Sequence, residues 1–242
     1  MVNCSELIMK RKELEDLLDR LSQDETFTLL DKSIEIRIYD LMINARIKYN
    51  QAMNEDLDNI IKGLLEVPSD KIDNLSVGFS AKSTLLNWKE KYGHAPAYIF
   101  VLNFDPNNPQ HKEHSFGAMS GRSFRPCINR NINDQDIIED IEKIAYEDNA
   151  VIIDKKGLIL ATNIQLVDVN PSAILGEFSK NSDDHKKFGF VHEVHSRHFS
   201  SLGASYHIPG SVVYTLGEAG YIRRFEKGKI TFSTVEQEIR AL

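Results

Sequence analysis

The chain has 242 residues and a formal net charge of -7, with 41% hydrophobic and 27% charged residues. This composition is ordinary for a globular protein and leaves room for one large domain or two small ones. The negative charge argues against a dedicated nucleic-acid-binding protein, which usually carries a basic face, so we expect no nucleic-acid partner.

Cysteine usage and hydropathy predict the compartment. The two cysteines, Cys4 and Cys127, are too few for a disulfide framework, which favours a reducing environment. The first residues lack the basic and apolar regions of a signal peptide. No apolar run approaches the roughly 18 residues that span a bilayer. We therefore expect a cytoplasmic protein with no membrane partner.

Residues 1–93 are predicted to be helical. Leucines at helical spacing predict a first helix that includes Leu14 to Leu21. A second helix is predicted over about 26–49, where alternating isoleucines also suit a strand but the length favours a helix. A third is predicted from Leu57 to Leu65, and a fourth around Trp88.

Residues 94–242 are predicted to form strands as well as helices. The sequence around Asp154–Gly157 is typical of a hairpin turn, with Gly157 supplying a positive φ. Further strands are predicted at 97–102, 151–153, 158–160, 212–215, 221–225 and 229–232, with helices after Asp134 and over 192–206. The predicted fold is α/β (α+β), a central mixed β-sheet flanked by helices, preceded by the N-terminal helical region.

Two carboxylates in predicted turns are candidate catalytic or metal-binding residues. Asp148 precedes an apolar strand, where an aspartate is often a plain turn residue. The alternative is a metal ligand or a carboxylate that helps to activate a hydroxyl group. Glu218 lies in the tight Gly217–Gly220 turn. The alternative to a functional role is an exposed turn carboxylate without a function.

Basic residues suggest an anion site. Ser196, Arg197 and His198 lie near the start of a predicted helix, whose N-terminal N–H groups attract anions. The alternative is an ordinary polar first turn. Arg223 and Arg224 alternate with aromatic residues on a predicted strand, so one of them must face the inner surface or a neighbour, unless the strand is a solvated edge.

Histidines spaced three apart offer a different hypothesis. His192, His195 and His198 could hold a transition metal, as in a metal-dependent hydrolase. No glutamate between paired histidines completes a zinc-hydrolase motif, and neither a Walker A sequence nor a Gly-x-Gly-x-x-Gly fingerprint occurs.

The order and spacing of these motifs resemble the diadenylate cyclase domain, which is also found at the N-terminus of the bacterial DNA-integrity scanning protein. That family has Asp-Gly-Ala before an apolar strand, then a hairpin, a polar loop, Thr-Arg-His-Arg at a helix start and an acidic turn between paired strands. The matching segments are 148–153, 157–166, 196–201 and 211–229, within a resemblance that covers roughly 95–232. Asn149 stands where the family has Gly, and Phe199 where it has the second Arg.

The resemblance implies a nucleotidyltransferase that condenses two ATP molecules into the second messenger cyclic di-AMP and two pyrophosphates. Two subunits would face each other, so that each 3′-hydroxyl attacks the α-phosphate of the other ATP; a homodimer or larger homo-oligomer would be required. Mg²⁺ or Mn²⁺ would be bound by Asp148 and Glu218, and Asp148, Arg197 and His198 would be catalytic. The implied nucleotide-binding residues are Asn149, Ala150, Gln165, Leu166, Ser196, Arg197 and His198.

Two further hypotheses stay open. The domain could be a catalytically degenerate relative that binds ATP or a cyclic dinucleotide as a sensor. The N-terminal region, residues 1–93, could regulate the enzyme or promote oligomerisation by controlling how the catalytic domains, residues 94–242, meet.

Overall fold

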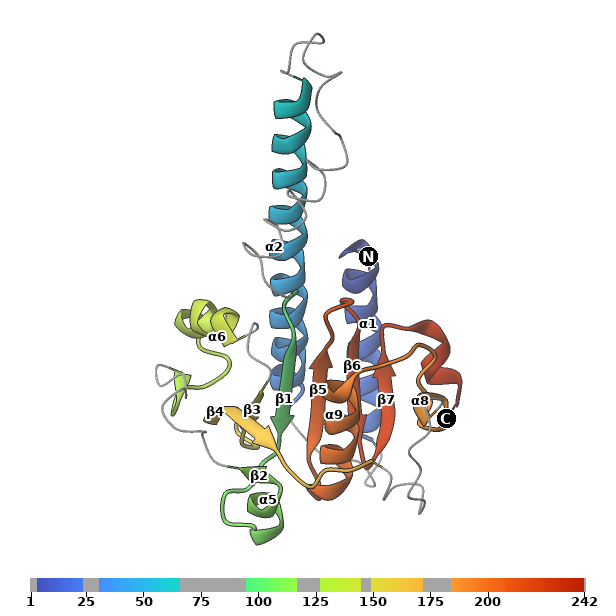
Figure 1. Cartoon of the computed structure of the whole chain (residues 1–242). Helices are drawn as coiled ribbons and strands as arrows, with labels where there is room; N and C mark the ends of the chain where they lie inside the picture. The colour runs from blue at the N-terminus through green and yellow to red at the C-terminus, as the bar shows by residue number, and fades with distance from the viewer. Residues whose placement is uncertain are drawn as a thin grey trace.

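The computed structural model describes residues 4–23, 31–65, 95–116, 127–144, 149–171 and 184–241. Its centre is a seven-stranded sheet in the order β2-β4-β3-β1-β5-β6-β7, with helices on both faces (Figure 1). β1 runs parallel to β3, and the other neighbouring pairs are antiparallel. The predicted mixed sheet with flanking helices is therefore confirmed.

The strands are β1 (Tyr98–Leu102), β2 (Ser115–Phe116), β3 (Ala150–Ile153), β4 (Ile159–Leu166), β5 (Val212–Leu216), β6 (Ile222–Glu226) and β7 (Lys229–Ser233). The α-helices are α1 (Cys4–Leu21), α2 (Lys32–Leu65), α5 (Pro109–Glu113), α6 (Ile138–Ile144), α8 (Asp184–Lys187) and α9 (Ser196–His207). Two short 3₁₀ helices are η2 (Gln135–Ile137) and η3 (Glu236–Ala241).

β1 lies at the centre of the sheet and is buried on both sides. Successive side chains of a strand point to opposite faces, and every residue of β1 is apolar, as expected for a strand covered on both faces. Tyr98, Phe100 and Leu102 belong to one hydrophobic core, whereas Ile99 and Val101 belong to the other.

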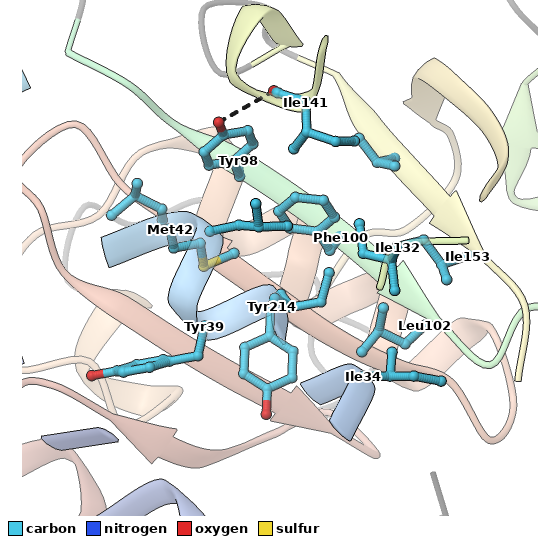
Figure 2. Packing of buried hydrophobic residues seen from close by; sticks show 14 of the residues in the cluster. Ile34, Tyr39, Met42, Tyr98, Phe100, Leu102, Ile132, Ile141, Ile153 and Tyr214 are labelled. Atoms are coloured by element: carbon cyan, nitrogen blue, oxygen red, sulfur yellow. Dashed lines mark hydrogen bonds between the residues drawn. The ribbon is translucent and has the colours of Figure 1, made fainter. Parts of the chain in front are cut away.

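α1 and α2 cover one face of the sheet. Figure 2 shows Tyr39 and Met42 of α2 beside Phe100 of β1 and Tyr214 of β5. The two helices that were predicted over about 26–49 and 57–65 are one helix of 34 residues, because no proline and no glycine before Gly63 interrupts this stretch. The helix predicted around Trp88 lies outside the described residues.

The N-terminal helices share a hydrophobic core with the sheet. Leu14 of α1 and Ile38 of α2 are buried in the same cluster as Val151 of β3 and Phe232 of β7. The division of the chain at residue 93 stays a prediction. None of the helices in the described ranges combines the length and the apolar character that crossing a membrane requires.

α9 covers the opposite face of the sheet (Figure 1). Leu202 and Ala204 of this helix are buried with Val213 and Phe225 of the sheet. The helix was predicted over 192–206, but it begins at Ser196. The backbone of His195 is extended, with φ -90° and ψ 178°, so the helical turns start only after it.

Gly203 lets α9 approach the loop after β4. A Cβ atom on Gly203 would lie 1.8 Å from the backbone oxygen of Val169, a separation that backbone atoms cannot accept. We expect Gly203→Ala to lower the free energy of unfolding by about 3 kcal/mol, as overpacking does, measured by urea denaturation. Ser200→Ala on the same helix is the control and should have little effect; equal stability of the two variants would contradict the close approach.

Candidate functional site

The β3–β4 hairpin forms one side of the candidate site. Asp154 begins its turn, and the Oδ1 atom accepts hydrogen bonds from the backbone N–H groups of Lys156 and Leu158, both at 2.8 Å. Gly157 has the predicted positive φ, +84°. The register pairs Ala150 with Ile164 at the other end of the hairpin. Asn149–Ala150 and Gln165–Leu166, both predicted to bind nucleotide, therefore lie near each other.

The first turn of α9 forms the second side. Ser196, Arg197 and His198 are its first three residues, and His195 at the N-cap makes no side-chain capping bond. The first backbone N–H groups of a helix have no partner within the helix, and its dipole favours negative charge there. Thr215 of β5 donates a 2.5 Å hydrogen bond to Ser201 and so ties α9 to the sheet.

A cavity of about 730 Å³ lies between these two sides. Every predicted nucleotide-binding residue lines it, and so does Glu218. Cavities of this size hold small ligands such as nucleotides. Asp148, the remaining predicted catalytic residue, lies outside the described residues. The lining residues are Ile99, Asn149, Ala150, Ile164, Gln165, Leu166, His192, Glu193, Val194, His195, Ser196, Arg197, His198, Ser200, Gly217, Glu218, Ala219, Tyr221 and Arg223.

The turn between β5 and β6 brings a carboxylate to the rim of the cavity. Glu218 is half exposed, and Oε1 lies 3.7 Å from Nη1 of Arg197. Arg46 of α2 donates a 2.8 Å hydrogen bond to the backbone oxygen of Glu218, so an N-terminal helix contacts this turn directly. A Cβ atom on Gly217 would lie 2.6 Å from Nε2 of His198, so a larger residue at position 217 would collide with the imidazole ring.

His198 is a neutral imidazole in this environment. Burial lowers its pKa well below the ordinary range, and the positive charges of Arg223 and Arg197 lower the pKa further. Nη1 of Arg223 lies 3.2 Å from Nε2 of His198 and 3.5 Å from Nδ1, so the guanidinium contacts both ring nitrogens. His198 can therefore offer the cavity a hydrogen bond but no positive charge at neutral pH.

Arg223 and Arg224 are both buried, so the alternative of a solvated edge is wrong. They point to opposite faces of β6, as successive strand residues do. Arg223 lines the cavity and pairs with Glu238, whereas Arg224 pairs with Glu35 of α2 and with Glu226. The alternating pattern indicated that one arginine faces inward. The pattern did not indicate that both faces of this strand are covered.

The three histidines do not form a metal site. His192 stacks on Tyr221 with ring centroids 5.8 Å apart, His195 is the N-cap of α9, and His198 faces Arg223. No three His, Cys, Asp or Glu side chains are grouped as metal ligands anywhere in the ranges that the structure describes. The hydrolase hypothesis therefore lacks the ligand arrangement that it requires.

The carboxylate of Glu218 is an oxygen donor of the kind that Mg²⁺ or Mn²⁺ takes together with a phosphate ligand. Mg²⁺ usually keeps several waters and takes one or two protein carboxylates in addition to substrate phosphates. Glu218 supplies one such carboxylate at the rim of the cavity, with half of its side chain exposed.

Phe199 makes an aromatic contact where the resemblance would place a second arginine. Its ring packs edge-to-face on Phe188 and on Phe190, with centroids 5.8 Å and 5.7 Å away. Asn149, in place of the family glycine, donates a side-chain hydrogen bond to Asn163 of β4. Both departures are thus accommodated by contacts within the protein.

Comparison with known proteins identifies no family: no protein-family model matches this sequence, and neither does any curated protein. A function for this chain therefore rests on the cavity and on the residues around it.

Proposed function

We propose that this protein is a diadenylate cyclase that joins two ATP molecules into cyclic di-AMP with release of two pyrophosphates. The observation that carries the proposal is the common cavity. Four separate parts of the sequence line the same space: Asn149–Ala150, Gln165–Leu166, the first turn of α9 and Glu218. Each of these segments resembles a motif of the diadenylate cyclase domain, with Asn149 and Phe199 as departures.

The chemistry required is the transfer of an α-phosphoryl group. The 3′-oxygen of one ATP forms a bond to the α-phosphorus of the other, the bond to the bridging oxygen of pyrophosphate breaks, and the hydroxyl proton is released. Such transfers are accelerated mainly by positioning the reactants and by neutralising charge. A divalent cation bound by Asp148 and Glu218 would supply positive charge against the phosphates and favour ionisation of the hydroxyl.

The first turn of α9 is proposed to hold the leaving pyrophosphate. Arg197 offers a planar pair of donors, which suits phosphate oxygens, and the N-terminus of the helix adds backbone N–H groups and a favourable dipole. Ser196 adds a hydroxyl, and the neutral His198 a hydrogen bond. Support for this assignment comes from the exposed position of Ser196 and from the cavity-lining position of all three residues.

A reaction between two ATP molecules needs two nucleotide sites that face each other. One chain supplies one first turn of α9 and one Glu218 to its cavity, so a second chain would have to supply the facing site. We therefore propose a homodimer or larger homo-oligomer as the active species. Arg46, which contacts the Glu218 turn, is a route by which residues 1–93 could influence the meeting of two sites.

The second candidate function is a sensor that binds ATP or a cyclic dinucleotide without turnover. The packing of Phe199 against Phe188 and Phe190 favours it, because this position carries no phosphate donor. The two candidates differ in one measurable respect, the formation of a covalent product.

Incubation of the purified protein with ATP and Mn²⁺ tests the proposal. We expect a cyclic dinucleotide by mass spectrometry, and we expect Asp148→Asn to lower its formation by at least about 100-fold. Asp136→Asn, at an exposed carboxylate, is the control and should leave the rate unchanged. Tight ATP binding without product would favour the sensor, and full activity of Asp148→Asn would show that the role given to Asp148 is wrong.

A further inference from the structure

A buried carboxylate lies behind the cavity, on the 3₁₀ helix η3. The Glu238 side chain is fully buried, and its two oxygens accept four hydrogen bonds. Nε and Nη2 of Arg223 each donate at 2.7 Å, Oγ of Ser233 donates at 2.6 Å, and the backbone N–H of Val191 donates at 3.2 Å. Each carboxylate oxygen therefore has two donors.

Arg223 connects this carboxylate to the cavity. Two of its nitrogens are held by Glu238 in the planar arrangement that makes arginine–carboxylate pairs strong and directional. The third, Nη1, lies 3.2 Å from Nε2 and 3.5 Å from Nδ1 of His198. The Phe190 ring packs against the same guanidinium, 5.3 Å from its central carbon. With these contacts the guanidinium has one orientation, which directs Nη1 towards His198.

We propose that Arg223 and Glu238 are positioning residues, which hold His198 and the segment before α9 in the arrangement that a nucleotide phosphate requires. This inference rests on the proposed function, in which His198 contacts the ligand. The action is indirect: Glu238 orients Arg223, and Arg223 fixes the ring of His198.

The charges of the pair explain why both residues are needed. Glu238 neutralises the guanidinium locally, so that Arg223 can contact His198 without an uncompensated buried charge, which would be costly. Nη1 lies within 3.5 Å of both ring nitrogens of His198, so the held guanidinium restricts where the imidazole ring can lie.

A second contact links Glu238 to the wall of the cavity. The Val191 N–H bonds to the same carboxylate, and the residues that follow, His192 to His195, line the cavity up to the N-cap of α9. Glu238 therefore joins β6 to this segment. Loss of its charge should therefore disturb two walls of the cavity together.

The test uses the full chain with Glu238→Gln, which keeps the shape of the side chain but directs an amide N–H₂ at groups that are themselves donors. Glu236→Gln is the matched control, because Glu236 is exposed on the same 3₁₀ helix. We expect Glu238→Gln to change the nitrogen-15 NMR shifts of His198. We also expect it to raise the KM for ATP about 10-fold or more while kcat changes less. Glu236→Gln should match the wild type in both.

A double variant covers the case in which Glu238→Gln does not fold. Replacing a buried ion pair by apolar residues of similar size is often tolerated, so Arg223→Met combined with Glu238→Met should fold, and we expect it to show the same changes in His198 shifts and KM. Unchanged shifts and an unchanged KM in a folded variant would overturn the inference. If the wild type makes no cyclic dinucleotide, the proposed function is wrong. The positioning of His198 is still tested in that case, because the nitrogen-15 shifts do not depend on turnover.

Discussion

Replacement of Arg197 by methionine should lower kcat/KM for cyclic dinucleotide formation by about 1000-fold. Arg197 is in the first turn of α9, and its side chain is 15% exposed. Its guanidinium lines the cavity, with Nη1 3.7 Å from Oε1 of Glu218. Methionine keeps the length of the side chain and removes the charge and the planar donors. The loss should therefore fall on phosphate binding while the fold is retained, which steady-state kinetics and circular dichroism together would show.

Two comparisons make the Arg197 experiment decisive. Arg197→Lys keeps the charge but not the paired donors, so its activity should lie between those of the wild type and Arg197→Met. Arg20→Met removes an exposed arginine from α1 and should leave the kinetics unchanged. If Arg197→Met kept the wild-type kcat/KM, the first turn of α9 could not be the phosphate site.

Glu35→Ala should lower the free energy of unfolding by about 3 kcal/mol. Glu35 of α2 is buried, accepts hydrogen bonds from Nε of Arg224 at 2.7 Å and from Nη2 at 3.3 Å, and also accepts from the Tyr214 hydroxyl. Its removal leaves Arg224 buried, with Glu226 as the remaining carboxylate partner. A buried charge that loses a partner is destabilising because water cannot replace that partner.

Urea denaturation of Glu35→Ala beside Glu55→Ala measures this effect. Glu55 is exposed on the same helix, so its removal should change the free energy of unfolding by less than about 0.5 kcal/mol. A loss in Glu35→Ala no greater than that in Glu55→Ala would mean that α2 is not held on the sheet through Arg224.

Elements with strong local patterns could be predicted from the sequence. β1 is a short run of β-forming apolar residues between turns, and the β3–β4 hairpin has Asp154 and Gly157 at the positions that its turn requires. The residues predicted to bind nucleotide and Glu218 line one cavity, as their common motif order led us to expect, whereas lining residues such as Glu193 and Tyr221 had no such prediction. The roles given to the predicted residues remain predictions.

The contacts that hold the site together could not be predicted, because their partners are distant in sequence. Glu35 and Arg224 are 189 residues apart, and Arg46 and Glu218 are 172 apart. Neither pair has a local pattern that would indicate it. The same limit applies to the start of α9, where hydrophobic spacing continues upstream of Ser196 but the backbone of His195 is extended.

The two buried arginines of β6 have a consequence for folding during synthesis. Until β6 has been made, Glu35 is an unpaired carboxylate on a helix face that must be buried, so α2 cannot dock in its final position as soon as it leaves the ribosome. Docking has to wait for a strand 189 residues further on. Contacts of such large sequence separation slow folding, and we expect the N-terminal helices and the sheet to fold as one cooperative unit.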